Sequence, residues 1–293
     1  MVLNALSIDV EEWFHAELVR KHYDGPKTPQ VSEATKPLLD LLKEKRVKAT
    51  FFVLGEVAES NPELIKKIAG AGHEIASHGY SHEPLDRLNA RSFDGELNRT
   101  EKALKAAGAP KPRGFRAPSF SLNQKTIWAL GVLAKRGYAY DSSVYPVATG
   151  LYGVPNAPLK PYKPSQTNLV EEDANGKITE VPLSVTKILG KRIPFGGGFY
   201  LRFFPLWFTK RAIRSANQEG RSAVVFLHPW EAFAGTPKMK LGAFDSFVTY
   251  HGAGTALAKL AALLDDFEFA PLHEIAETAR EQEKQGKRDK ARN

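Results

Sequence analysis

The sequence predicts an α/β fold in which parallel strands are joined by helices. Apolar runs typical of strands alternate with helical patterns up to residue 140, and the alternation resumes after residue 205. Acidic residues and histidines follow directly after several of the strand-like runs. Because (β/α) barrels build their active sites where the strands end, we expect the functional residues at that edge of the sheet.

The predicted strands are short runs rich in apolar and β-branched residues. They cover residues 2–9, 47–54, 73–77, 114–119, 138–140, 222–227 and 267–270. The first of them carries Leu3, Leu6 and Ile8 and then becomes acidic at Asp9.

The predicted helices begin and end at residues that cap helices. They cover residues 33–46, 61–71, 91–107, 124–135, 205–218, 255–264 and 272–283. Ser32 is the expected N-cap of the first helix, and Pro62 stands in the first turn of the second. Gly72, Gly108 and Gly137 follow three of the helix ends.

Residues 144–205 interrupt this alternation and are predicted to be a loop-rich insertion. The segment holds many prolines and the triplet Gly196-Gly197-Gly198, with a strand pair expected near 178–188. A loop region of this length is usually functional or flexible. No linker divides the chain, so we expect one domain over 1–280 and a basic flexible tail over 281–293.

Composition excludes several classes of protein. The 293 residues include no cysteine, which rules out disulfides, thiolate metal sites and cysteine nucleophiles. The net charge of +8 is interpreted as a basic surface and tail, because no nucleic-acid-binding motif accompanies it. The N-terminus has no signal-peptide pattern and no run of about 18 apolar residues occurs, so the expected location is cytoplasmic.

Two histidines spaced four apart follow the strand at 73–77. His78 and His82 could place two imidazoles on one side of a helical turn, and imidazole is the commonest protein ligand for zinc-like metals. Asp9 and Glu11 end the first strand, and residues i and i+2 point to the same side of a strand. Glu12 remains a competing acidic ligand at this stage.

Five short segments resemble, in order, the motifs of the polysaccharide deacetylase family, the NodB-homology domain of carbohydrate esterase family 4. The resemblance covers roughly residues 3–275 and implies a distorted (β/α) TIM-like barrel of about seven parallel strands. The segments are Asp9-Val10-Glu11-Glu12, Ser77-His78-Gly79-Tyr80-Ser81-His82, Arg116-Ala117-Pro118, Tyr140-Asp141-Ser142-Ser143 and Leu227-His228-Pro229-Trp230.

The resemblance also implies the role of each residue. Asp9 would be the catalytic base, held by a bidentate pair with Arg116, and His228 would be the general acid, oriented by Asp141. The remaining implied residues are the metal ligands Glu11, His78 and His82 and the substrate-pocket residues Leu227, Trp230 and Tyr145. A backbone N–H between residues 141 and 145 would stabilise the oxyanion.

The implied activity is removal of N-acetyl groups from the amino sugars of a glycan, with a divalent metal. Zinc is the first expectation, with cobalt, nickel and manganese as alternatives; Glu11 stands where the family usually has aspartate. Residues 195–202 resemble a glycine-rich stretch of members linked to exopolysaccharide export. That likeness implies a cell-surface polysaccharide, or its lipid-linked precursor, modified from the cytoplasmic side.

Two other functions stay open. One is an amide hydrolase acting on a small cyclic ureide, and the other is a carbohydrate-binding relative that lost catalysis. Residues 205–214 mix bulky apolar groups with cations, as interfacial helices do, so peripheral membrane contact at the inner face of the membrane is a further expectation. No nucleic-acid partner is expected, and the sequence does not predict an oligomeric state.

Overall fold

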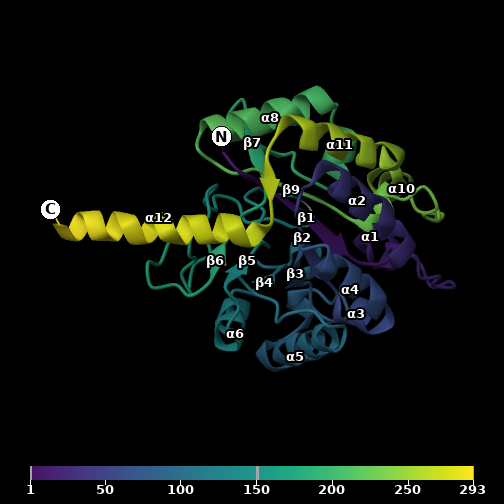
Figure 1. Cartoon of the computed structure of the whole chain (residues 1–293), viewed down its shortest axis with the longest axis horizontal. Helices are drawn as coiled ribbons and strands as arrows, with labels where there is room; N and C mark the ends of the chain where they lie inside the picture. The colour runs from purple at the N-terminus through teal and green to yellow at the C-terminus, as the bar shows by residue number, and fades with distance from the viewer. Residues whose placement is uncertain (1, 150–151, 293) are drawn as a thin grey trace.

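Eight parallel strands curl into an open half-barrel surrounded by helices (Figure 1). The computed structural model describes residues 2–149 and 152–292. The sheet order is β10-β1-β2-β3-β4-β5-β6, and β9 pairs with β1 on the edge opposite β2. The strands are β1 Asn4–Val10, β2 Thr50–Val53, β3 Glu74–Ser77, β4 Gly114–Phe115, β5 Tyr140–Asp141, β6 Thr179–Glu180, β9 Val224–Leu227 and β10 Phe269–Ala270.

Helices connect these strands and cover the outer face of the sheet. They are α1 Glu17–Arg20, α2 Val31–Lys45, α3 Gly55–Ser60, α4 Pro62–Gly70, α5 Ala90–Ala106, α6 Trp128–Arg136, α7 Phe199–Phe203, α8 Leu206–Gln218, α9 Pro229–Ala232, α10 Ala243–Tyr250, α11 Ala256–Asp266 and α12 Leu272–Arg292. None of these helices combines the length and the apolar composition that crossing a bilayer requires.

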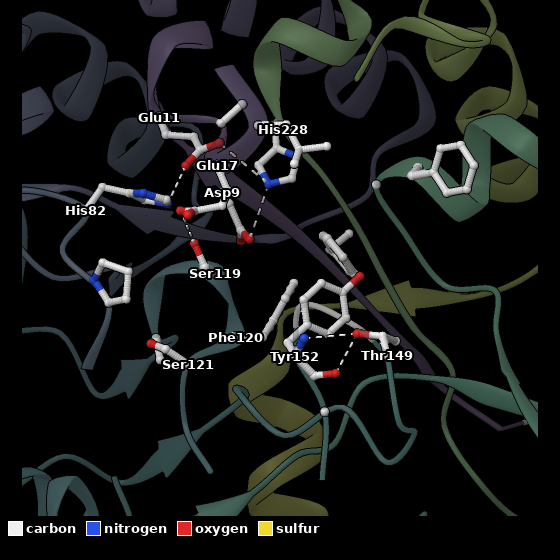
Figure 2. Close-up of a pocket in the computed structure, with 18 of the residues that line it drawn as sticks. Asp9, Glu11, Glu17, His82, Ser119, Phe120, Ser121, Thr149, Tyr152 and His228 are labelled. Carbon is white, nitrogen blue, oxygen red and sulfur yellow. Dashed lines mark hydrogen bonds and ion pairs between the residues drawn. The ribbon is translucent and has the colours of Figure 1, made fainter. Parts of the chain in front are cut away.

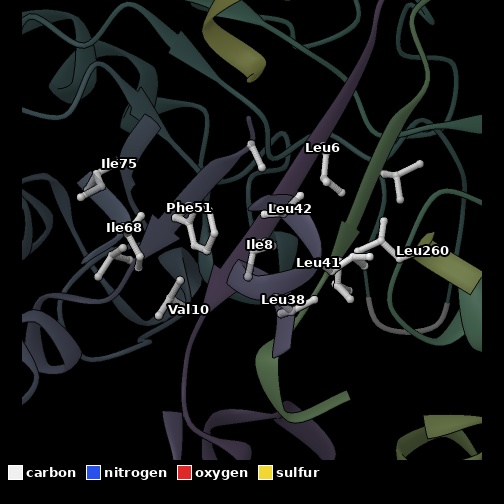
Figure 3. Close-up of a cluster of buried hydrophobic side chains, with 14 of the residues drawn as sticks. Leu6, Ile8, Val10, Leu38, Leu41, Leu42, Phe51, Ile68, Ile75 and Leu260 are labelled. Carbon is white, nitrogen blue, oxygen red and sulfur yellow. The ribbon is translucent and has the colours of Figure 1, made fainter. Parts of the chain in front are cut away.

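The largest apolar cluster lies between β1 and the helices outside it. Leu6, Ile8 and Val10 of β1 pack against α2, with Leu38 among its buried side chains, and Leu260 of α11 joins them (Figure 3). Because side chains alternate along a strand, the same alternation turns Ser7 and Asp9 to the inside of the half-barrel. The burial of the apolar face of β1 therefore fixes the orientation of its acidic end.

The register of the sheet brings the ends of the strands to one edge. Asp9 is paired with Phe52, Val53 with Ser77, and Phe115 with Asp141. Ile8 is paired with Leu227 on the other side of β1. The residues that follow these strands therefore meet at one edge, as the sequence predicted.

The segment 144–205 contains more structure than the predicted strand pair. Its β6 joins the parallel sheet, while β7 Val185–Ile188 and β8 Lys191–Pro194 form a separate antiparallel hairpin. Residues 150 and 151 of this segment lie outside the described residues. Helix α10 was not among the predicted helices.

The last helix extends beyond the predicted range of 272–283, and the flexibility expected of the tail over 281–293 stays a prediction. Helix α12 continues to Arg292 and projects away from the half-barrel (Figure 1). Glu, Gln, Lys and Arg dominate these residues and all have high helix propensity. Glu283 also pairs with Lys163 and Lys287, at 2.7 Å each. Residue 293 lies outside the described part of the chain.

Candidate functional site

Side chains that follow several strands converge on a cavity of about 960 Å³ at the edge where the strands end. Figure 2 shows Asp9, Glu11, His82 and His228 pointing toward one another there. Six predicted residues line the cavity: Asp9, Glu11, His78, His82, His228 and Trp230. Its volume lies near the upper end of the range for ligand pockets.

Glu11, His78 and His82 form one buried cluster of potential metal ligands. One ligand atom of each lies within 4.8 Å of the others. Glu11 Oε2 lies 2.7 Å from His82 Nε2. His78 Nδ1 donates to the carbonyl oxygen of Arg116 at 2.8 Å, which leaves its Nε2 free to bind a metal. His82 Nδ1 is buried and makes no hydrogen bond with the described residues.

This donor set fits a catalytic divalent ion. One carboxylate and two imidazoles supply three protein ligands, which leaves coordination positions for water and substrate. Burial lowers the pKa of His78 to about 4, and it outweighs the attraction of Asp9. Burial would raise the pKa of Glu11, but His82, His228 and His78 together hold it well below its usual range. Both groups are thus in their metal-binding protonation states at neutral pH.

The two histidines are brought together by a loop, which corrects the expected helical turn. Residues 78–84 contain no helix, and Gly79 and His82 have positive φ angles of 79° and 56°. A non-glycine residue in the left-handed region is uncommon and is found most often where a site constrains the backbone. The loop still directs the imidazole of His82 toward the carboxylate of Glu11, although its backbone is not helical.

Glu12 does not join this cluster. Its Oε2 accepts hydrogen bonds from the amides of Gln30 (2.8 Å) and Val31 (3.1 Å) at the start of α2. These amides are among the first of the helix and have no partner within it, so a carboxylate satisfies them well. The geometry therefore separates the two candidates that the sequence left open, because Glu11 faces the histidines and Glu12 caps a helix.

Asp9 is held by Arg116, whose side chain is fully buried. Arg116 Nη1 donates to Asp9 Oδ1 (2.7 Å) and to Ser7 Oγ (2.8 Å). Its Nε and Nη2 donate to the carbonyl and the hydroxyl of Ser142. The Asp9–Arg116 pair is therefore joined through one nitrogen, and not through the two that the family resemblance implied. Asp9 Oδ2 takes no part in it and lies 3.9 Å from His228 Nε2.

Glu231, and not Asp141, orients His228. Glu231 Oε2 lies 2.8 Å from His228 Nδ1, and Glu231 Oε1 accepts from Arg202 Nε at 2.6 Å. Burial would lower the pKa of His228, but the Glu11 and Glu231 carboxylates raise it to about 9. Burial would raise the pKa of Glu231, but Arg202 and His228 hold it at about 2. The sequence analysis missed both Glu231 and Arg202, although Glu231 follows Trp230 directly in the fifth motif.

Asp141 lies inside the sheet beneath Arg116 and makes no ion pair with His228 within the described residues. Its carboxylate accepts from the amide and the hydroxyl of Ser143 and hydrogen-bonds Glu180. Burial raises the pKa of both carboxyls, and raises that of Glu180 further because Asp141 lies beside it. One proton shared by this pair is the arrangement that two buried carboxyls favour.

The backbone donors expected near residues 141–145 are largely in use. The amides of Ser142, Ser143 and Val144 donate to Phe115 O, Asp141 Oδ2 and Glu180 Oε1. These three amides stabilise the strand ends, and within the described residues the amide of Tyr145 is the donor of this range that remains for an oxyanion.

Leu227 and Tyr145 do not line the cavity, which corrects two expected substrate contacts. Leu227 lies on the helix-facing side of β9, whereas Phe226 faces the half-barrel interior and lines the cavity. Tyr145 is fully buried under Tyr152, a cavity residue that the sequence analysis did not identify. The alternation of side chains along β9 is the sequence signal that identifies Phe226 as the inward-facing residue, whereas the resemblance implied Leu227.

Comparisons with known proteins agree with this fold. Residues 23–140 match the family model described as polysaccharide deacetylase, and residues 142–277 match a domain of unknown function, DUF3473. The peptidoglycan-N-acetylglucosamine deacetylase of Bacillus cereus is 40% identical over 115 residues, which are 39% of this chain and 40% of that protein. The chitooligosaccharide deacetylase of Bradyrhizobium sp. (strain ANU 289) is 35% identical over 127 residues, which are 42% of this chain and 52% of that protein. Both matches thus span about half of the relative's length or less.

The fold has a counterpart among solved structures. A protein from Mycobacterium smegmatis, provisionally described as a polysaccharide deacetylase, aligns with a TM-score of 0.61 and 23% identity. The alignment covers 96% of this chain and 90% of that one. It confirms the distorted (β/α) barrel, and the family model and the relatives support a polysaccharide deacetylase domain.

Proposed function

We propose that this protein is a metal-dependent hydrolase that removes N-acetyl groups from the amino sugars of a glycan. The observation that carries the proposal is the meeting of three buried groups at one cavity. They are the Glu11–His78–His82 cluster, the carboxylate of Asp9 held by Arg116, and the imidazole of His228 held by Glu231. Together they supply a metal site, a base and an acid, which is what hydrolysis of an unactivated amide needs.

Glu11, His78 and His82 would hold the ion, and zinc suits a set of one carboxylate and two imidazoles, with cobalt, nickel and manganese as alternatives. A bound divalent ion supplies Lewis acidity for the acetamide carbonyl and lowers the pKa of water. Trp230 Nε1 donates to Glu11 Oε1 at 3.2 Å, so Trp230 fixes the orientation of the proposed acidic ligand.

Asp9 is the proposed general base. Because Arg116 contacts only Asp9 Oδ1, the other oxygen remains available to accept a proton from the water that attacks the acetamide carbon. The buried Arg116 keeps the carboxylate oriented, since its guanidinium is itself fixed by Ser142. Asp9 is 2% exposed, so the water it activates would be shielded from bulk solvent.

His228 is the proposed general acid. Its pKa of about 9 keeps the imidazole protonated at neutral pH, so Nε2 can donate to the leaving amine when the C–N bond breaks. Glu231 occupies Nδ1 and therefore directs Nε2 toward Asp9 and Glu11. The products are acetate and a free amino sugar.

The natural substrate is proposed to be a cell-surface polysaccharide or its lipid-linked precursor. The support is the likeness of residues 195–202 to members linked to exopolysaccharide export, together with the deacetylase names of the relatives. In the structure these glycines lie against β9: a Cβ on Gly197 would lie 2.4 Å from the carbonyl oxygen of Phe226. They serve close packing beside the cavity.

Metal content and acetate release test the proposal. With N-acetylglucosamine oligomers, the wild-type protein should bind about one divalent ion and release acetate, and His78→Ala should lose both. His73→Asn is the matched control, because His73 is also buried but accepts a backbone hydrogen bond from Ala49 outside the cluster. If wild type and His78→Ala hold the same amount of metal, the ligand assignment is wrong.

The two alternative functions give different results in the same assay. Metal binding without acetate release, together with turnover of a cyclic ureide such as hydantoin, would favour the small-amide hydrolase. Glycan binding without turnover by the metal-loaded protein would favour the binding protein. The intact Asp9–Arg116 and His228–Glu231 pairs favour catalysis over the binding protein, because each fixes a proton-transfer group.

Peripheral membrane contact through residues 205–214 stays a prediction. Trp207 on α8 is 66% exposed and Arg211 is exposed, which supports it. Lys210 and Arg214 instead pair with Asp266, so they contribute less charge to such a surface. The wild-type protein should sediment with anionic liposomes at low salt and Trp207→Ser should not. If the wild-type protein does not sediment with the liposomes, the predicted membrane contact is wrong.

A further inference from the structure

The cavity extends well beyond the groups that act on the acetamide. Figure 2 shows the acidic and histidine side chains at one end and Phe120, Tyr152 and Thr149 at the other. Much of the second end lies in the part of the chain that matches a domain of unknown function, and it is lined by Ala148, Thr149, Tyr152, Gly153 and Pro155. An acetyl group fills only a small part of about 960 Å³, so the far end has room for a larger part of the substrate.

A row of aromatic rings leads from the proposed acid to this far end. The ring centroids of His228 and Phe226 lie 6.0 Å apart, those of Phe226 and Phe120 5.1 Å, and those of Phe120 and Tyr152 5.4 Å. All four residues line the cavity. Phe226 is buried, whereas Phe120 and Tyr152 are partly exposed and present ring surface to the cavity.

The two partly exposed rings are held in place from behind. Tyr152 stacks on the buried Tyr145 with centroids 5.4 Å apart and planes at 6°, and its hydroxyl hydrogen-bonds Tyr200. Phe120 lies over the guanidinium of Arg116 at 5.7 Å. Phe120 and Ser119 have φ angles of 50° and 53°. This conformation is costly for residues with a Cβ, so the surrounding contacts must maintain it. A surface fixed in this way loses little entropy when a ligand binds.

The chemistry of such a wall fits a sugar ring. The faces of aromatic rings carry negative charge density, which attracts the polarised C–H groups on the apolar face of a pyranose. Asn123 and Lys125 line the same cavity and can reach hydroxyl groups from the rim.

We infer that Phe120 and Tyr152 form a binding subsite for the pyranose ring next to the sugar that is deacetylated. This inference rests on the proposed function and deepens it, because it makes the protein selective for oligosaccharides or polymers over single amino sugars. Tyr152 is a specificity-determining residue in this scheme, and it takes no part in proton transfer.

The test compares a monosaccharide with an oligomer. With N-acetylglucosamine and its β-1,4-linked tetramer as substrates, Tyr152→Ala should lower kcat/KM for the tetramer about tenfold, mainly through KM. The value for the monosaccharide should change by less than about threefold. Tyr152→Phe, which keeps the ring, should behave like the wild type. Equal losses on both substrates, or no loss on either, would overturn the subsite.

A binding measurement separates this inference from the proposed function. Calorimetry on Asp9→Asn, which retains the cavity but lacks the proposed base, should give tighter binding of the tetramer than of the monosaccharide. Adding Tyr152→Ala should remove most of the difference. That result would uphold the subsite even if the wild-type protein released no acetate. Tetramer binding no tighter than monosaccharide binding would refute it, whatever the outcome for hydrolysis.

Discussion

Each proposed proton-transfer residue is held by a buried partner of opposite charge. Asp9 is fixed by Arg116 through one oxygen, and His228 is fixed by Glu231 through Nδ1. In both pairs the atom needed for chemistry remains free and faces the other pair, since Asp9 Oδ2 and His228 Nε2 lie 3.9 Å apart. A water and an amide that bind against these two atoms from the cavity would meet a base and an acid already held in place.

Removing the charge of Glu231 should shift the pH dependence of the reaction. Glu231 is one of the groups that raise the pKa of His228 to about 9. In Glu231→Gln the imidazole should lose its proton at lower pH, so the alkaline limb of kcat/KM should move to lower pH by about one unit. The amide of Gln can still hydrogen-bond His228, which limits structural damage.

Glu12→Gln is the control for that pH profile. Glu12 is also a buried carboxyl, but it caps α2 and does not contact His228. Its substitution should leave the alkaline limb where it is in the wild type. An alkaline limb that does not move in Glu231→Gln would mean that His228 is not the acid whose ionisation limits the rate.

Lysine should fail to replace Arg116. Arg116 uses three nitrogens to reach Asp9, Ser7 and Ser142 at once, whereas lysine offers a single nitrogen on a flexible chain. Arg116→Lys should lower kcat by about 100-fold or more with little change in KM, because the base loses its orientation. Steady-state kinetics measures this, and retention of kcat within about threefold would contradict the role of Arg116.

The predicted site residues that line the cavity are mostly those placed by strand ends. Asp9, Glu11, His78, His82 and His228 follow predicted strands, and parallel strands bring their ends to one edge. The partner of His228 could not be predicted in this way. It depends on the turn at His228–Glu231 and on Arg202 from the short helix α7, and neither has a sequence periodicity that identifies it. Asp141 was misassigned because the fold offers it a nearer partner, Glu180.

At the scale of elements, β9 carries both the acid and the start of the aromatic row. It is covered on one side by β1 and on the other by the glycine-rich segment, whose Gly197 forms a parallel bridge to Phe226. Gly196 approaches β9 equally closely, since its Cβ would lie 2.3 Å from the carbonyl oxygen of Val224. Two glycines thus let a loop take the place of a strand beside β9.

Adding one methyl group at Gly197 should therefore displace Phe226. The Cβ of Gly197→Ala would lie 2.3 Å from the Phe226 ring, so the strand or the ring must move at a cost of about 1–3 kcal/mol. We expect a lower unfolding midpoint in urea and weaker activity, because His228 follows Phe226 by two residues.

Gly95 offers the matched control within the same chain. It lies inside α5, and a Cβ there would meet no atom within 4 Å. Gly95→Ala should raise the unfolding midpoint, because the higher helix propensity of alanine adds about 1 kcal/mol to the free energy of unfolding. Its activity should be that of the wild type. Equal effects of the two substitutions would mean that close packing against β9 is not what the glycine-rich segment provides.

For the whole molecule, the alternation of strands and helices was sufficient to predict a parallel sheet with its site at one edge, and the family resemblance implied the barrel. The alternation could not predict that the sheet stays open, because β6 is only two residues long and is embedded in a proline-rich segment. Nor did it predict that α12 runs on to Arg292, since a charged, water-exposed helix lacks the apolar stripe used to recognise one. Both errors concern segments where apolar periodicity is weak.

Binding of a metal at one edge should be measurable in the stability of the whole chain. Glu11 follows β1, the His78 and His82 loop follows β3, and β2 lies between these strands. An ion held by all three side chains would tie the strand ends together in the folded state only, and zinc at 100 times its dissociation constant would add about 2.7 kcal/mol. For a domain of this size that corresponds to a rise of about 5 °C in Tm over protein stripped with a chelator. Scanning calorimetry should show this rise in the wild type and in Asp9→Asn but not in His78→Ala. A similar rise in His78→Ala would mean that the ion binds elsewhere, for instance at the His273–Glu74 pair on the opposite edge of the sheet.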